Sequence, residues 1–184
     1  MRNFPVPDYE ELPEDLQERI DQEREEAGFV PNVFSAMGYD PAQFRAFFAY
    51  HDALVEESAL ERHEIEEIVV TVSGINDCLY CVVAHGALVR IYARDPTLAD
   101  QLATNHRAAD LPADERAMLD FAAKLTESPG EVTDADREAL LEHYSLEEVW
   151  EITSVAAFYN LSNRLAIVAD MRPNREFYTL GRGE

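Results

Sequence analysis

The sequence predicts an all-α, single-domain helical bundle. Apolar residues recur at three- and four-residue intervals in successive segments, a spacing that places them on one face of an α-helix. Capping signals stand directly before several of these segments, as at Asp40-Pro41 and Ser145-Leu146-Glu147-Glu148. At 184 residues, 47% of them hydrophobic, the chain can bury one core and is short for two domains. We therefore expect one domain over residues 1–184.

The N-terminal part predicts little regular structure before its first helix. Residues 1–12 are rich in proline and acidic residues, which indicates an extended arm. Two apolar residues four apart among charged neighbours predict a short, largely solvated helix over 13–26, with Gly28 as its C-cap. Residues 29–32 then predict a turn.

The middle of the chain predicts a helical hairpin. Asp40 caps a helix that carries several aromatic residues, which we expect in the core. Residues 58–61 read as a capping box for a helix over 60–76. Its β-branched run could also form a strand, but the cap and the length favour a helix. A second helix is expected over 78–94, folded back on the first and packed against the helix over 146–169.

The last third of the chain also predicts helices. The helix over 146–169 is apolar on more than one face, which is typical of a helix buried at the centre of a fold. Residues 171–184 are expected to form a tail. Three shorter helices are expected over residues 96–105, 111–125 and 133–144.

The charge composition excludes several kinds of partner. The chain has 15 Lys and Arg against 37 Asp and Glu, a formal net charge of −22. Nucleic acid and anionic membranes would be repelled. An acidic excess of this size is typical of a protein that stays soluble in high salt, where screening weakens self-repulsion. With no apolar leader and no run of ~20 apolar residues, we expect a soluble, cytoplasmic protein.

The candidate reactive residues lie between residues 58 and 94. Cys78, Cys81 and His85 are spaced by three and four residues, so one helix places them on a single face. Glu66 lies on the preceding segment, where the hairpin would return it towards them. Its neighbours Glu64 and Glu67 are turned away from that face by about a hundred degrees or more. This spacing is typical of a reactive site.

The two cysteines are better suited to redox chemistry than to a structural disulfide. A bridge between Cys78 and Cys81 would close a very small loop and barely restrict the unfolded chain. A Cys-x-x-Cys motif at the start of a helix favours the nucleophilic thiolate. Asn76 or Asp77 can supply the N-cap. Because Asp77 places a negative charge beside Cys78, we expect Cys81 to be the better nucleophile.

These residues resemble the signature of a known family. Glu66, the run VVTVSGINDC, the motif Cys78-Leu79-Tyr80-Cys81 and His85 are similar to the AhpD-like, carboxymuconolactone-decarboxylase superfamily, in its peroxidase-related branch. Residues 28–32 and 158–166 are similar as well, so the resemblance covers most of the chain. One position differs, because AhpD proper has a histidine directly before its second cysteine, where this chain has Tyr80.

The resemblance implies a thiol-dependent peroxidase with the AhpD-like helical fold. Its substrates would be alkyl hydroperoxides or hydrogen peroxide, and a dithiol reductant or redox protein would restore the thiols. In this scheme Cys81 becomes the sulfenic acid and Cys78 is the proton donor and resolving thiol. Glu66 and His85 would relay protons. No metal or organic cofactor is expected, and a homo-oligomer is expected because a small chain of strongly apolar helices would leave apolar patches exposed.

Other interpretations remain open at the level of sequence. The two cysteines could be small buried hydrophobic residues, or they could bind zinc with His85 and Glu66. The chain could also be a lyase of the carboxymuconolactone decarboxylase type, or a redox or metal-binding module without catalysis. The remaining histidines have no cysteine or second ligand nearby in the sequence and are expected at the surface; they are His51, His63, His106 and His143.

Overall fold

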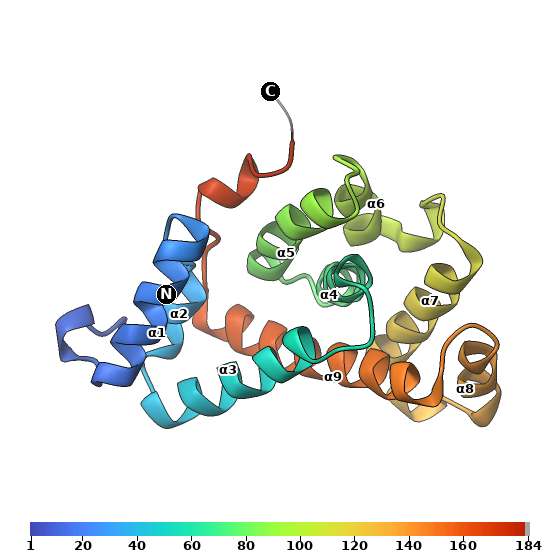
Figure 1. The fold of residues 1–184 in the computed structure, drawn as a ribbon, viewed down its shortest axis with the longest axis horizontal. Coiled ribbons are helices and arrows are strands. Elements are labelled where there is room, and N and C mark those ends of the chain that lie inside the picture. The colour runs from blue at the N-terminus through green and yellow to red at the C-terminus, as the bar shows by residue number, and fades with distance from the viewer. Residues whose placement is uncertain (183–184) are drawn as a thin grey trace.

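The computed structural model describes residues 1–182, and this part of the chain is helical and contains no strand (Figure 1). The α-helices are α1 (Glu14–Ala27), α2 (Asn32–Met37), α3 (Pro41–Glu56), α4 (Arg62–Ile75), α5 (Leu79–Tyr92), α6 (Leu98–Asn105), α7 (Ala113–Glu127), α8 (Asp134–Leu141) and α9 (Leu146–Ala169). Short 3-10 helices lie at Tyr9–Glu11, His106–Ala108, Pro129–Glu131 and Glu176–Tyr178. The all-α fold expected from the sequence is confirmed.

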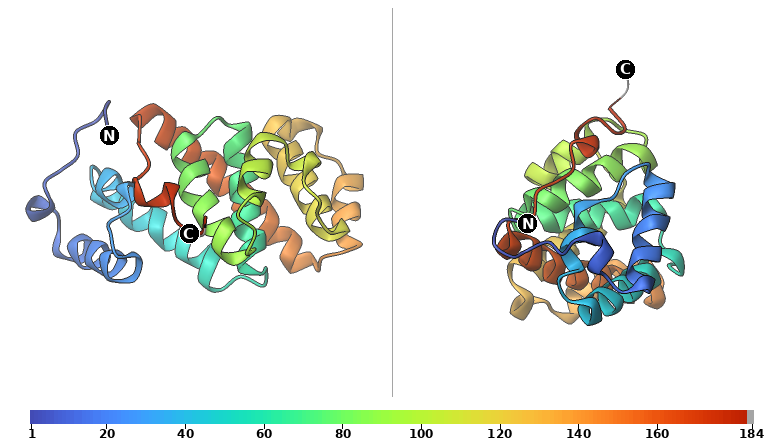
Figure 2. Two further views of the ribbon diagram at one scale, coloured as in Figure 1. Left: turned by 90° about the horizontal axis from the view of Figure 1, so that it is seen from above. Right: turned by 90° about the vertical axis from the view of Figure 1, so that its left-hand side faces the viewer.

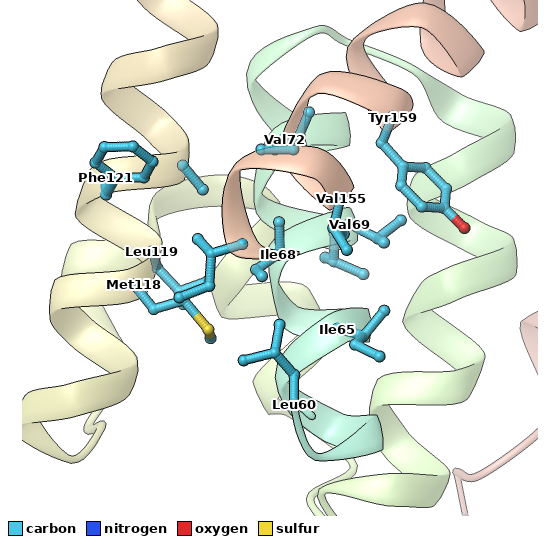
Figure 3. Close-up of a cluster of buried hydrophobic side chains, with 14 of the residues drawn as sticks. Leu60, Ile65, Ile68, Val69, Val72, Met118, Leu119, Phe121, Val155 and Tyr159 are labelled. Carbon is cyan, nitrogen blue, oxygen red and sulfur yellow. The ribbon is translucent and has the colours of Figure 1, made fainter. Parts of the chain in front are cut away.

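Helix α4 lies at the centre of the fold. It packs against α5, α6, α7 and α9, and Figure 1 shows it end-on with these helices around it. Its apolar residues meet those of α7 and α9 in the main core, whose members include Ile68, Met118 and Val155 (Figure 3). The predicted hairpin of α4 and α5 against α9 is therefore confirmed.

Capping places several helices where the sequence predicts them. Asp40 accepts hydrogen bonds from the backbone N–H groups at the start of α3, at 3.0 and 3.2 Å. Thr133 and Ser145 each form a capping box at the start of α8 and α9. Gly28 ends α1 in a left-handed conformation with φ 80°, which glycine adopts without steric cost.

One local prediction is wrong, and one short helix was not predicted. The capping box of α4 is formed by Glu61 and Glu64, because the hydroxyl of Ser58 is bound instead to the carboxylate of Glu151 on α9. The region after residue 29 is also more regular than a turn, since α2 begins at Asn32. Both differences depend on contacts with distant segments.

Helix α9 is not buried centrally, contrary to the prediction. Its inner face packs on α4, α7 and α5, but the helix runs along one side of the molecule (Figure 1). Large apolar side chains on its outer face are exposed, including Leu146, Trp150 and Val168. The apolar residues of α9 therefore form two faces: the inner face is buried, and the outer face is exposed.

The two chain ends lie against the helices. The N-terminal segment is bound to the end of α9, where Arg2 N–H donates to the carbonyl of Ala169 at 3.2 Å. The C-terminal segment crosses α5, where Arg90 donates to the carbonyls of Phe177 and Leu180 at 2.8 Å. Figure 2 shows the N-terminal segment, in dark blue, beside the C-terminal end of α9, in red. In the part of the chain that the structure describes, no helix combines the length and the hydropathy needed to cross a bilayer.

Candidate active site

Both candidate cysteines lie where α4 passes into α5. Cys78 is the N-cap residue of α5, and Cys81 lies in the first turn of the same helix. Both are free thiols, and each residue is only 1% exposed. They pack in a small cluster with residues of α2, α9 and the C-terminal segment. The two sulfur atoms are therefore held away from bulk water.

The turn before Cys78 sets its position. Asp77 adopts a left-handed conformation with φ 56°, and the N–H of Cys78 donates to the carbonyl of Ser73 at 2.9 Å, which closes the end of α4. The prediction that Asn76 or Asp77 caps α5 is wrong. Asp77 forms the turn, and the amide of Asn76 donates to two asparagine side chains on α9 at 3.0 Å each.

The pKa values of the two thiols are shifted in opposite directions. The pKa of Cys78 is lowered, chiefly by the hydrogen bond from the Cys81 thiol and also by backbone N–H groups in the first turn of α5, which outweigh its burial. The pKa of Cys81 is raised well above its usual value, because its thiol is bound to Cys78 and because it is buried. Both shifts favour Cys78 as the thiol that ionises first.

The position of Cys78 at the N-cap favours its thiolate, whereas the sequence favoured Cys81 as the better nucleophile. That expectation gave weight to the charge of Asp77 and neglected the position of Cys78 at the N-cap. A thiolate at the N-cap meets the unpaired N–H groups and the positive end of the helix dipole. Cys81, one turn further into the helix, donates its thiol hydrogen to Cys78.

Glu66 and His85 meet across the hairpin as the sequence predicts. Oε2 of Glu66 lies 2.7 Å from Nδ1 of His85, and both side chains are largely buried. Because the carboxylate can only accept, Nδ1 is the donor in this contact. His85 lies one turn after Cys81 on α5 and keeps 16% of its side chain exposed.

The second oxygen of Glu66 is also paired. Arg62, one turn earlier on α4, approaches Oε1 of Glu66 to 3.1 Å and lies over the ring of Tyr92 at 5.3 Å. A carboxylate this deeply buried needs such partners, since an unpaired charge is costly away from water. Arg62 was not predicted as a site residue from the sequence, although its spacing of four residues from Glu66 is typical of an ion pair on a helix.

Two residues of α9 complete the surroundings of the thiols. The ring of Tyr159 packs edge-on against His85 at 4.9 Å, and burial raises its pKa well above the usual value, with smaller contributions from the charges of Glu66 and Cys81. Asn163 is fully buried, donates to Ser73 Oγ at 3.0 Å and lowers the pKa of both thiols by hydrogen bonding. The sequence placed residues 158–166 near the site only through the family resemblance.

Tyr80 has a different role from the histidine found at its position in AhpD proper. It is buried, and its hydroxyl accepts a hydrogen bond from the N–H of Val33 at 3.1 Å. Burial raises its pKa further above the usual value of a phenol. Tyr80 therefore ties α5 to α2.

Three of the four histidines expected at the surface are partly or fully buried. His51 is half-buried, with Nδ1 3.0 Å from a carboxylate oxygen of Asp52. His106 is buried, with Nε2 2.9 Å from a carboxylate oxygen of Asp120. His63 is half-buried and lies near Glu67 and Glu115. The sequence could not indicate the contacts of His106 with Asp120 and of His63 with Glu115, because each joins residues from different helices.

Comparisons with known proteins agree with the fold and the motif. The model of the carboxymuconolactone decarboxylase family matches residues 41–123, which include the hairpin of α4 and α5. No curated protein matches the sequence.

Solved structures match over nearly the whole chain. A Ralstonia eutropha JMP134 protein, described as an alkylhydroperoxidase AhpD core and an uncharacterized peroxidase-related protein, is 51% identical, with a TM-score of 0.96 over 98% of this chain and 96% of its own. A peroxidase-related protein from Silicibacter sp. TM1040 is 41% identical, with a TM-score of 0.91 over 97% and 93%. A putative antioxidant defence protein AhpD from Agrobacterium tumefaciens is 26% identical, with a TM-score of 0.67 over 76% and 95%.

Proposed function

The chain belongs to the AhpD-like, carboxymuconolactone decarboxylase superfamily, and from this premise we propose that it is a thiol-dependent peroxidase. Its substrates are alkyl hydroperoxides or hydrogen peroxide, and Cys78, Cys81, His85 and Glu66 form its active site. One observation carries the proposal. The two thiols at the start of α5 share a hydrogen bond that lowers the pKa of Cys78, which is the condition for a nucleophilic sulfur.

The first step is attack on the peroxide by the Cys78 thiolate. The sulfur forms a bond to the terminal oxygen, the O–O bond breaks, and an alkoxide leaves. Cys81 supplies the proton that turns this alkoxide into an alcohol. The products are a sulfenic acid on Cys78 and a thiolate on Cys81.

The second step joins the two sulfurs. The Cys81 thiolate attacks Cys78, the S–O bond breaks, and the leaving hydroxide takes a proton relayed from solvent by His85. Glu66 holds the ring of His85 in place through its hydrogen bond at 2.7 Å. An external dithiol then reduces the disulfide. This need for a reducing pool supports a cytoplasmic location as part of the proposal.

Mass spectrometry after one equivalent of hydroperoxide tests the cycle. The reduced protein should lose two hydrogens across the Cys78–Cys81 peptide and regain them with a dithiol. In the Cys81→Ser variant, a sulfenic acid should be trapped on Cys78. If the reciprocal Cys78→Ser variant forms a sulfenic acid on Cys81 faster, the roles implied by the family resemblance are correct. If both thiols stayed reduced after addition of the hydroperoxide, the proposal would be wrong.

A lyase of the carboxymuconolactone decarboxylase type is a second candidate, favoured by the match over residues 41–123. Decarboxylation does not require a pair of thiols. Turnover of the lactone by the Cys78→Ser/Cys81→Ser variant would therefore support the lyase. A titratable dithiol without turnover of either substrate would indicate a redox module.

A further inference from the structure

A second cluster of ionisable side chains lies where α4 meets α7. His63 and Glu67 are four residues apart and share a face of α4, and Glu115 lies in the first turn of α7. One imidazole nitrogen and two carboxylate oxygens all lie within 4.8 Å of one another. His63 Nε2 and Glu115 Oε1 are only 3.4 Å apart. Three potential ligand atoms therefore converge.

Glu67 has an incomplete set of partners. The residue is 1% exposed, and nothing within residues 1–182 forms a hydrogen bond to its Oε2 atom. Buried charges in proteins are usually paired or bound to metal ions, because an unpaired one is costly. The carboxylate is thus placed where a cation would satisfy it.

An open pocket of about 460 Å³ adjoins the cluster. It is lined by His63, Glu67 and Glu115, and also by Asp95 and Asp110. None of the described residues that line it is a lysine or an arginine. The pocket therefore attracts cations and admits water to the three converging side chains.

We propose that His63, Glu67 and Glu115 form a binding site for a divalent transition-metal ion of the zinc type. Imidazole and carboxylate groups are ordinary zinc ligands, at about 2.1 Å from the metal. Tetrahedral geometry then separates the ligand atoms by about 3.4 Å, which His63 and Glu115 already satisfy. The pocket leaves the remaining position for water, as in open zinc sites. An imidazole ligand also favours zinc over magnesium, which prefers a shell of oxygens.

Zinc binding to the metal-free full-length protein tests the proposal. The Cys78→Ser/Cys81→Ser variant is the parent protein, so that the thiols cannot bind the ion. After dialysis against a chelator, titration with zinc chloride in molar salt should give one site, and desalted protein should retain one equivalent by elemental analysis. Magnesium chloride should bind at least ~10-fold more weakly.

Substitutions in this parent assign the ligands. Glu67→Gln, Glu115→Gln and His63→Gln should each weaken zinc binding by at least ~10-fold, which is the effect of losing one of three protein ligands. Asp114→Asn is the matched control, because it removes an equal charge from an exposed neighbour of Glu115 and should leave the affinity within about 2-fold.

These results distinguish a specific zinc site from non-specific attraction of zinc to acidic side chains. Absence of stoichiometric zinc would overturn the proposal, as would equal losses in Glu67→Gln and Asp114→Asn. If Glu67→Gln lost helical circular dichroism, the zinc affinity of Glu115→Gln would test the site instead, because Glu115 is only half-buried. Because the parent lacks both thiols, the result is independent of peroxidase activity.

Discussion

At the scale of single residues, the thiol pair behaves as one titrating unit. Cys78 keeps a lowered pKa because Cys81 donates its thiol hydrogen to it. We expect alkylation of the wild-type protein to start at Cys78 and to persist below the pKa of an ordinary cysteine, about 8.5. In Cys81→Ala the donor is lost, so the midpoint of the alkylation rate should move to higher pH.

The control for this measurement is Cys81→Ser. Its hydroxyl can still donate to Cys78, so the midpoint should shift less than in Cys81→Ala. A low midpoint that persists in Cys78→Ala would show instead that Cys81 carries the negative charge. Peptide mapping after limited alkylation identifies the modified sulfur in each variant.

Glu66 is a positioning residue that acts through His85. Glu66→Gln keeps the shape but removes the charge that faces Nδ1 of His85 and Arg62. We expect peroxide reduction to slow by at least ~10-fold, a conservative value for a positioned acid–base group. The pH profile of the rate should also change, because the proton relay rests on this contact. Stopped-flow rates across pH measure both effects.

Glu64→Gln is the matched control for Glu66→Gln. Glu64 serves the capping box of α4 and accepts from the hydroxyl of Tyr144 at 2.9 Å. Glutamine can keep both contacts, because its Oε1 can accept from the N–H of Glu61 while its Nε2 donates to the Tyr144 oxygen. Its rate should stay within about 2-fold of wild type. Equal and small effects of the two substitutions would mean that Glu66 takes no part in the relay.

The sequence could predict residues at helical spacing, and it predicted a contact across helices only where the family resemblance selected the residue. The intervals of Cys78, Cys81 and His85 follow from one helix, and the family resemblance selected Glu66 from its acidic neighbours. Asn163 and Glu67 were not selected. Asn163 on α9 binds Ser73 on α4, and Glu67 on α4 meets Glu115 on α7, so no local pattern contains either contact.

At the scale of helices, Gly74 controls the contact between α4 and α6. A Cβ atom at this position would lie 2.2 Å from the carbonyl oxygen of Ala103, so the backbone of α6 would have to move. We expect Gly74→Ala to lower the free energy of unfolding by at least ~2 kcal/mol, within the usual range for overpacking. Urea denaturation followed by circular dichroism measures the change.

Gly130 provides the control for Gly74. A Cβ atom there would meet nothing within 4 Å in the described structure, so Gly130→Ala should change the stability by no more than about 0.5 kcal/mol. Equal stability of the two variants would contradict the close helix contact. Helix α4 continues through Gly74 to Ile75, within the helix expected over 60–76.

Helix boundaries were predicted well where the cap is local. Asp40, Thr133 and Ser145 bind backbone groups within their own first turn, so their sequences contain the whole signal. The prediction was wrong at Ser58, whose hydroxyl is bound to Glu151 on a distant helix. The same limit explains Asn76, whose amide binds α9.

At the scale of the whole molecule, α9 carries an uncovered apolar stripe. Leu146, Trp150, Leu161 and Val168 are 67%, 73%, 51% and 62% exposed. At 100° per residue they fall within about 60° of one another around the helix, over a length of about 33 Å. The pattern that predicted central burial of α9 thus describes one buried face and one exposed face. Exposed apolar surface of this extent is typical of an interface.

We expect this stripe to bind a second copy of the chain. The net charge of −22 opposes self-association in dilute buffer, and molar salt reduces the screening length to about 3 Å. Association should therefore strengthen as salt rises.

Trp150→Ser/Leu161→Ser should weaken the association by at least ~10-fold, because buried aromatic and aliphatic side chains dominate most interfaces. Ile91→Ser, a 43% exposed residue on α5, is the control and should have little effect. Sedimentation equilibrium across salt concentrations measures the association. A monomer in molar salt, or equal weakening by both variants, would contradict an interface on α9.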